Sequence, residues 1–245
     1  MEDQQSSPET QSLGTRIMNV FSSPSEAFAD IAGLESKTNL WLVPMLVAIM
    51  IGVGISFAVS TNENLRAQII EMQQRGLDAQ VAKGSMTQAQ ADQQIRAMEQ
   101  MGMLFAVFGA IFAAIGICFM YFVGTLFLWL LGRFGLGGNY GYSTYLAVFG
   151  TAAWIGILGS VVTGMLMIGL NSMFATVGAS LAILPDFDPT NMTHKILSKI
   201  EVFSLWQASV VGIGLSKLTG KSTGIGIGAA VGLLLVWHAI SVMVF

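Results

Sequence analysis

The chain has 245 residues, of which 53% are hydrophobic and only 10% are charged. Soluble domains usually contain about 25% charged residues, so this composition, with a mean hydropathy of +0.67, predicts a polytopic membrane protein. A net charge of −3 argues against a nucleic-acid partner, and the single cysteine excludes an intrachain disulfide. We therefore expect an all-α, polytopic membrane helical bundle that contacts the lipid bilayer.

Residues 1–39 form the first predicted unit, a polar tail over residues 1–12 followed by two amphipathic helices. Ser23 as N-cap and Glu26 three residues later predict a capping box for the second helix. Apolar side chains recur at helical spacing in both helices, at Leu13, Ile17 and Phe21 and then at Phe28, Ile31 and Leu34. We expect the second helix to lie on the membrane surface and pack against the bundle, with docking of a partner as the alternative.

A membrane domain over residues 40–245 is predicted to contain five transmembrane helices. A hydrocarbon core about 30 Å thick requires about 20 apolar residues. The five apolar runs cover residues 40–60, 103–132, 144–170, 200–218 and 224–245. The fourth run is the most polar, because it contains Gln207 and carries Glu201 and Lys217 near its ends. Residues 171–184 are too short to span and predict a re-entrant or interfacial helix.

Residues 62–101 are polar and predict an extramembrane helical hairpin between the first two spans. Asn62 is a suitable N-cap for its first helix, and Ser85 with Gln88 predicts a capping box for the second. Large apolar residues are few, so we expect the hairpin to lean on the bundle or on another subunit. Basic residues divide almost evenly between the two sides of a five-span arrangement, so the positive-inside rule does not fix the orientation.

The connector between the second and third spans lies within LLGRFGLGGNYGYSTYLAVFG, Leu130 to Gly150. A Walker loop requires a lysine followed by Ser or Thr, and a dinucleotide loop requires a preceding strand. Neither accompanies this segment. We interpret Gly137 and Gly138 as a flexible hairpin, with Arg133 at the membrane interface.

The sequence contains few groups that could carry chemistry. Asp186, Asp188 and His194 share one loop and leave metal binding open as a hypothesis, although no second cluster supports it. An HExxH motif is absent. We therefore predict no enzyme, no cofactor, and no catalytic or metal site.

Two ionisable residues and a set of small residues remain as candidates of functional or structural importance. His238 lies within the fifth span, where we favour a hydrogen bond to another helix over a transport role, and Glu201 marks a membrane boundary. Small residues recur at spacing four and predict close helix packing, at Gly52 and Ser56, Gly156 and Ser160, Ser160 and Gly164, Gly212 and Ser216, Gly224 and Gly228, and Gly228 and Gly232.

Three stretches, FSSPSEAF, GGNYGYSTYLAVFGTAAW and IEVFSLWQASVVGIGLSKLTGKST, together with the five-span layout, resemble the Ypt-interacting protein (Yip) family. The resemblance covers roughly residues 17–245 and implies a cytoplasmic N-terminus. Eukaryotic members work in vesicle traffic and contact prenylated Rab-type GTPases through longer N-terminal regions, whereas this chain is more similar to the bacterial branch.

The resemblance implies a multi-pass protein of the bacterial cytoplasmic membrane, with the endoplasmic reticulum or Golgi membrane as the alternative. Together with the residues, it predicts a non-catalytic scaffold that binds a membrane-protein partner or a second copy of itself. The alternative is a transporter or channel with a path near the fourth and fifth spans.

Overall fold

The structure is a computed structural model that describes residues 11–244, and within this range it is built from helices and connecting loops. Most of the predicted tail lies outside the described residues. The helices are α1 (Leu13–Ser22), α2 (Pro24–Ala27), η1 (Ile31–Gly33), α3 (Thr38–Thr61), α4 (Glu63–Ala82), α5 (Gln88–Gln100), α6 (Met103–Leu130), η2 (Leu131–Gly135), α7 (Tyr142–Gly169), η3 (Ala179–Asp186), α8 (Met192–Lys199), α9 (Val202–Thr219) and α10 (Thr223–Val244).

Four helical segments are long and apolar enough to cross a membrane. They are Thr38–Thr61, Met103–Gly135, Tyr142–Gly169 and Thr223–Met243, which correspond to the first, second, third and fifth predicted spans. The fourth predicted span, α9, is not among them. It has 18 residues, about 27 Å at 1.5 Å per residue, and its apolar character is reduced by Gln207 and Lys217. The protein is thus an all-α membrane protein with four candidate spans.

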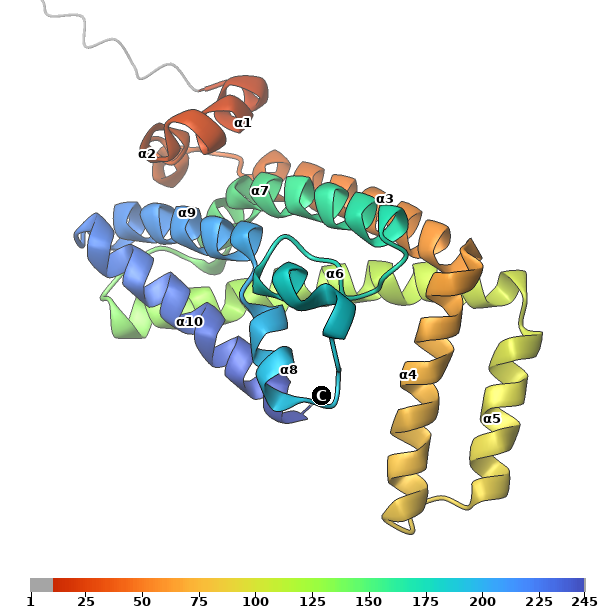
Figure 1. The fold of residues 1–245 in the computed structure, drawn as a ribbon. Helices are drawn as coiled ribbons and strands as arrows, with labels where there is room; N and C mark the ends of the chain where they lie inside the picture. Colours follow the sequence, from red (N-terminus) through yellow and green to blue (C-terminus); the bar gives the residue numbers. More distant parts are fainter. Residues whose placement is uncertain (1–10, 245) are drawn as a thin grey trace, which may run out of the picture.

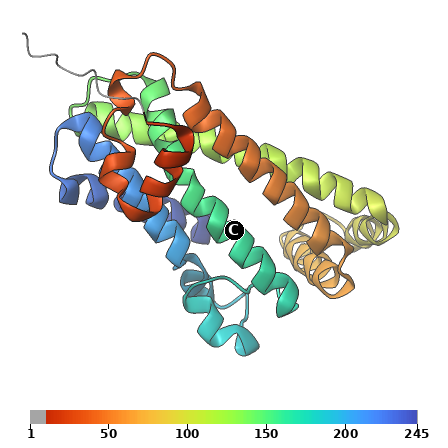
Figure 2. The same cartoon turned by 90° about the horizontal axis from the view of Figure 1, so that it is seen from above.

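Helix α7 is the centre of the bundle, between α3 and α9 (Figures 1 and 2). Its most apolar window is 56% buried, against 6% to 17% for the other candidate spans. Small residues on two of its faces permit this position. A Cβ on Gly150 would overlap the backbone of Trp41 in α3, and a Cβ on Gly159 would approach Cβ of Phe203 in α9 to 2.6 Å.

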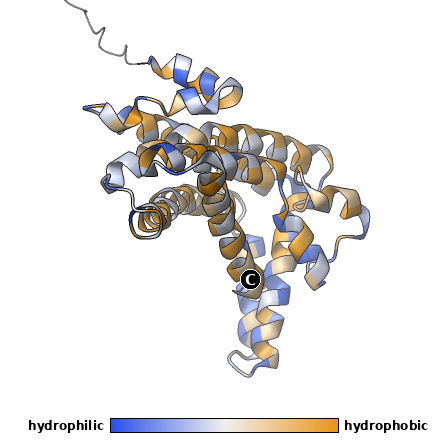
Figure 3. Ribbon diagram, turned by 90° about the vertical axis from the view of Figure 1, so that its left-hand side faces the viewer, coloured by the Kyte–Doolittle hydropathy of each residue, from blue (hydrophilic) through white to orange (hydrophobic). Residues whose placement is uncertain are grey.

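The long helices of the bundle consist largely of hydrophobic residues, as Figure 3 shows, and many of these side chains are exposed on its outside. On α6, Phe108, Ile111, Phe112, Ile115 and Phe119 have 45% to 69% of their surface exposed. Monomeric soluble proteins rarely expose contiguous apolar patches of this kind. Because α6 is apolar on nearly all sides yet little of it is buried inside the protein, its outer face contacts lipid.

Helices α1 and α2 and the short η1 pack across α7 and α9, as expected for the second predicted helix. Phe28 is buried and fits against Gly214 of α9, where a Cβ would lie 3.1 Å from the Phe28 ring. The predicted second helix is shorter than expected. It ends at Ala27, and the Ser23 side chain makes no capping hydrogen bond, so the predicted capping box with Glu26 is wrong.

An ion pair that the sequence pattern did not predict fixes this N-terminal unit. Arg16 is only 2% exposed; its guanidinium contacts Asp30 at 2.8 Å and donates a hydrogen bond to the Ala27 carbonyl at 2.5 Å. Removing a charged group from water is costly unless it is paired and hydrogen-bonded. The pair therefore holds α1 against the turn that follows α2.

Helices α4 and α5 lie side by side and project from the end of α3 and α6 at a steep angle (Figure 1). We call these two helices, with their connecting turn, the arm. Asn62 caps α4 as predicted, by accepting a hydrogen bond from the Leu65 N–H. The capping box of α5 is formed by Thr87 and Gln90 rather than by Ser85 and Gln88, because the helix begins two residues later than the sequence pattern predicted.

The arm is attached to the rest of the protein at its base. The Gln68 side chain donates to the Asn171 carbonyl at 2.8 Å and accepts from the Met173 N–H at 3.0 Å. Arg66 lies 5.4 Å above the Phe105 ring and donates to the Glu99 carbonyl. Beyond these contacts α4 and α5 pack mainly on each other, so within this chain the hairpin leans on the bundle at its base. The alternative, that it leans on another subunit, stays a prediction.

The segment between α7 and α9 contains more secondary structure than predicted. In place of one interfacial helix over 171–184 it contains η3 and, after a loop, the short α8. Phe174 stacks on Phe187 with ring centroids 4.4 Å apart. The backbone of Gly178 pairs with that of Glu201, which places this segment against the start of α9.

Candidate functional site

The glycine-rich connector is a turn built around one buried aromatic ring. Tyr145 is fully buried, and a Cβ on Gly138 would lie 2.5 Å from its hydroxyl oxygen. Gly137 has φ = +76°, a conformation that glycine adopts without steric cost. The Gly138 N–H donates to the Gly132 carbonyl at 2.8 Å, so it is not free to bind a phosphate. This geometry supports the hairpin interpretation for the connector.

Arg133 lies in η2, directly after α6, with an exposed side chain. Within the described residues it forms no ion pair, and its neighbour Phe134 is 73% exposed. A cation beside an exposed aromatic ring is typical of the boundary between membrane and water. The connector end of the bundle, which we name the hairpin end, therefore combines Arg133, Gly137 and Gly138.

The other two candidate residues lie at the opposite end of α9, which we name the loop end. Glu201 is the N-cap of α9; its carboxylate accepts hydrogen bonds from the Ser204 N–H at 2.7 Å and from the Ser204 hydroxyl at 2.5 Å. His238 is half-buried on α10, and the charged groups that act on its imidazole are Lys199 and Glu201. Its imidazole makes no hydrogen bond to the described residues, so the expected bond to another span is not formed.

The loop that suggested a metal site uses its polar groups for its own structure. The Asp188 carboxylate accepts from the Thr190 hydroxyl at 2.7 Å and from the Thr190 N–H at 2.8 Å, and these hydrogen bonds lower the pKa of Asp188 below its usual value. His194 Nδ1 accepts from the Asp188 N–H at 2.9 Å. Among residues 11–244, no three His, Cys, Asp or Glu side chains are grouped as metal ligands would be.

The interface between α9 and α10 is closed by backbone contact. A Cβ on Gly212 would lie 2.7 Å from the Gly226 carbonyl oxygen and would overlap Cα of Ile227. A Cβ on Gly226 would overlap the Gly212 carbonyl and lie 2.9 Å from Cβ of Ser216. Of the predicted small-residue faces, Gly212 and Ser216 are therefore in contact with α10, but their partner is Gly226.

The glycines predicted to form a packing face on α10 lie elsewhere. A Cβ on Gly224, Gly228 or Gly232 would meet no atom within 4 Å. A spacing of four places residues on one side of a helix, but it does not say which side faces the bundle.

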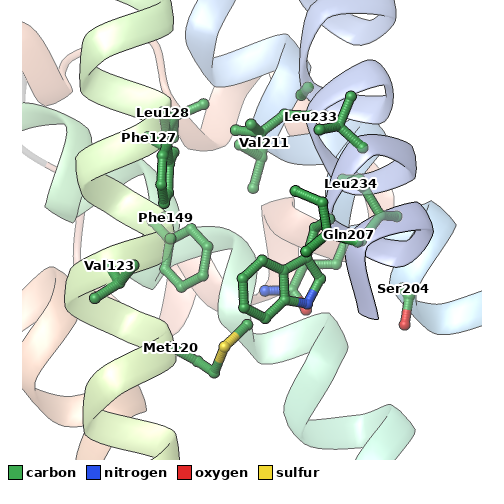
Figure 4. A pocket seen from close by; sticks show the side chains of 16 residues that line it. Met120, Val123, Phe127, Leu128, Phe149, Ser204, Gln207, Val211, Leu233 and Leu234 are labelled. Atoms are coloured by element: carbon green, nitrogen blue, oxygen red, sulfur yellow. The ribbon is translucent and has the colours of Figure 1, made fainter. Parts of the chain in front are cut away.

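A groove of about 290 Å³ lies between α6 and α10, with α9 and α7 behind it (Figure 4). Met120, Val123 and Phe127 of α6 line one side, and Leu233 and Leu234 of α10 line the other. Its polar groups are few, and the side chain of Gln207 on α9 is the one amide among them. The sequence marked Gln207 as a polar residue in the fourth span but gave no sign of a groove, because its walls come from helices far apart in the chain.

The fold and these sites define a polytopic, all-helical membrane protein whose long helices pack through glycines and expose apolar faces. The chain matches the family model of the Yip1 domain over residues 18–244 and therefore belongs to the Yip family. No curated protein and no solved structure shows a significant match. The family model covers nearly all the described residues, including both ends of α9.

Proposed function

We propose that this Yip-family protein is a non-catalytic, five-span membrane scaffold that binds a membrane-protein partner or a second copy of itself. In this proposal residues 1–39 form a cytoplasmic N-terminal unit, residues 40–245 form the membrane domain, and the arm within residues 62–101 is extramembrane. The bacterial cytoplasmic membrane is the proposed location, with the endoplasmic reticulum or Golgi membrane as the alternative.

The position of α9 supports a fifth crossing. Helix α7 ends at the loop end, while α10 begins at the hairpin end, and α9 connects the two. At its beginning Glu201 pairs with the backbone of Gly178, and at its end Thr219 lies close to Gly138 of the connector. A helix that runs from one end of the bundle to the other beside α7 crosses the same layer as α7 does.

The contact between α9 and α10 is the observation that carries the scaffold proposal. A transport path between the fourth and fifth spans requires polar groups around a space that water can enter. Gly212 and Gly226 instead bring the two backbones into contact, and the adjacent groove is lined mainly by apolar side chains. The dry interface favours a structural role for this helix pair.

One observation favours the transporter alternative. The side chains of Tyr121, Thr125 and Trp129 follow one face of α6, and each has a buried polar atom without a hydrogen-bond partner. Thr151 and Tyr145 of α7 have such an atom as well. A chain of water molecules through these groups would carry protons along about 12 Å of α6, in the half of the bundle nearer the hairpin end.

Flux measurements separate the two functions. We expect purified protein in sealed vesicles to show no proton, Na⁺ or K⁺ flux above that of empty vesicles, and the His238→Gln and Thr125→Val variants to behave like the wild type. A proton-coupled flux in the wild type that disappears in either variant would overturn the scaffold proposal and establish a transporter.

Cysteine labelling tests the proposed topology. Single cysteines at Gln80 and Gln93 on the arm, in a Cys118→Ser background, should react with a membrane-impermeant thiol reagent on intact cells. A matched cysteine at Lys221, in the turn between α9 and α10, should react only after lysis. The opposite pattern would reverse the orientation, and reaction of all three on intact cells would contradict the five-span arrangement.

Site-specific photo-crosslinking tests for a partner. Beyond its base the arm is mostly exposed: Leu77 and Ala91 are buried, and Val81, Met86 and Ile95 are half-buried. Gln80 and Gln93 are exposed, so photoreactive residues at these positions sample a surface that a partner can reach. Discrete adducts from these positions, absent with the same residue at the lipid-facing Phe112, support partner binding. Adducts that are equally frequent at all three positions would contradict a specific contact through the arm.

A further inference from the structure

The groove between α6 and α10 has the shape and chemistry of a lipid-binding site. Ligand sites in proteins are concave, mostly apolar, and carry a few polar groups that orient the ligand, with volumes of roughly 300–1,000 Å³. This groove, at about 290 Å³, is near the lower limit of that range. Met120, Phe127, Val236 and Ile240 line it and are also among the residues with exposed apolar surface. The groove therefore opens on the lipid-facing side of the bundle.

The polar groups of the groove gather toward one end. Ser204 and Gln207 lie in the first two turns of α9, whereas Val211 lies a turn further along the helix. Because α10 runs antiparallel to α9, Ala230 belongs with Val211 at the apolar end and Trp237 belongs with Gln207 at the polar end. The groove thus runs from a polar end near Glu201 to an apolar end deeper in the bundle.

The side-chain amide of Gln207 has no hydrogen-bond partner among the residues that the structure describes. The Gln207 side chain lies against Gly156 of α7, where a Cβ would overlap its Oε1 atom, and it forms no hydrogen bond with the described residues. An amide in hydrocarbon without a hydrogen bond is costly, by roughly 2 kcal/mol or more. A ligand that is apolar along most of its length and carries one hydrogen-bonding group would supply the hydrogen bond that this amide lacks.

We infer that the groove binds one acyl chain of a membrane glycerophospholipid, with an ester carbonyl of that lipid accepting a hydrogen bond from the Gln207 amide. Gln207 lies six residues after Glu201, about 9 Å along the helix at 1.5 Å per residue. If Glu201 lies at the membrane boundary, this depth corresponds to the junction of headgroups and acyl chains. Trp237, which also lines the polar end of the groove, fits the same depth, because Trp is enriched at that level.

The occupant follows from what surrounds the open side of the groove. The walls beside the opening are lipid-facing, so the molecules that reach it from within the bilayer are lipids. An acyl chain fills an apolar channel without desolvating charge, and an ester carbonyl is an acceptor that matches the donor N–H of the amide. A free fatty acid shares the chain but would bring a carboxylate close to the Glu201 carboxylate, and like charges repel.

A photoreactive phospholipid with a diazirine on one acyl chain tests the proposal. The purified full-length protein is reconstituted with this probe, irradiated, digested and mapped by mass spectrometry. We expect labelling to concentrate on Met120, Phe127 and Leu234, above the level at Phe112 and Ile115, which face bulk lipid on the same helix α6. Labelling of the groove at or below that bulk level would overturn the proposal.

Two variants make the test specific to the groove. Ala208→Phe places a ring in the groove and should abolish the excess labelling, while the matched control Ala239→Phe, on the exposed side of α10, should leave it unchanged. Gln207→Leu keeps the volume but removes the donor and should weaken lipid binding about fivefold, the equivalent of about 1 kcal/mol. If Ala208→Phe unfolds the protein, the Gln207→Leu result decides: unchanged labelling refutes the role of the amide.

Competition identifies the occupant and separates this inference from the scaffold proposal. Excess unlabelled diacyl phospholipid should remove the groove labelling, whereas palmitate at the same chain concentration should not. Removal by palmitate alone would assign the groove to a fatty acid and overturn the phospholipid assignment. Groove labelling does not depend on the flux and crosslinking results, so either proposal can fail while the other stands.

Discussion

Replacement of Gly226 by alanine tests whether α9 and α10 are held in backbone contact. A Cβ at this position would overlap the Gly212 carbonyl oxygen and lie 2.9 Å from Cβ of Ser216. Both obstacles are backbone atoms or sit directly on the backbone, so a change of side-chain rotamer cannot relieve them. Gly228→Ala is the matched control, because a Cβ there would meet nothing within 4 Å on the same helix.

The difference between the two variants isolates the steric cost. Both replacements gain the helix propensity of alanine over glycine, about 1 kcal/mol in a helix interior, and this gain cancels in the comparison. Overpacking costs about 1–3 kcal/mol, and an obstacle made of backbone favours the upper end of that range. We therefore expect Gly226→Ala to be about 3 kcal/mol less stable than Gly228→Ala, and Gly228→Ala to be at least as stable as the wild type.

Unfolding in mixed micelles, with SDS as the denaturant and the fluorescence of the native tryptophans as the signal, measures this difference. A crosslink between cysteines placed across the α9–α10 interface gives a second readout of helix separation. If the two variants differ by less than about 0.5 kcal/mol, the size of ordinary surface effects, the two backbones are not in contact. The dry interface, and with it the main support for the scaffold proposal, would then be lost.

Three further substitutions test other parts of the structure. Gly138→Ala should lower the midpoint of thermal unfolding and the expression level, because the added Cβ forces the connector away from the Tyr145 hydroxyl. The control Gly141→Ala, where a Cβ meets nothing within 4 Å, should change neither. Normal stability of Gly138→Ala with loss of partner binding would make the connector a recognition site. Asp30→Ala should destabilise the protein by about 3 kcal/mol in SDS unfolding, because it leaves Arg16 buried and unpaired; full stability of this single variant would show that the pair does not hold the N-terminal unit. Thr87→Ala should cost about 1 kcal/mol and raise amide exchange in the first turn of α5 only, and unchanged exchange would contradict the observed capping box.

The helical class and most of the long helices could be predicted from the sequence, because each rests on local information. A run such as 103–132 contains about thirty residues without a charge, and in the hydrocarbon of a bilayer its backbone must satisfy its own hydrogen bonds. The structure confirms one uninterrupted helix there, which continues as a single π-helical turn to Gly135. The glycine connector was predictable for a similar reason, since Gly137 and Gly138 lie between two apolar runs.

Details at helix ends were less predictable because several residues compete for each cap. Ser23 and Ser85 both had suitable partners three residues on, yet Thr87 is the cap that α5 uses. A helix ends where the chain turns away, and the position of that turn is set by tertiary contacts of other residues as well as by the capping residue. The break after Ala27 has such an origin, because Asp30 turns back to reach Arg16.

The candidate sites depended on tertiary structure. The sequence by itself determined that the chain is helical, apolar and glycine-rich, since composition and periodicity act within one segment. Only the packing decided that Gly226 contacts α9 while Gly228, two residues along, faces outward. Packing also decided that α6, α9 and α10 surround one groove with Gln207 at its polar end. Contacts between distant segments depend on how whole helices pack. The spacing of residues within one helix does not specify which of its faces contacts which other helix.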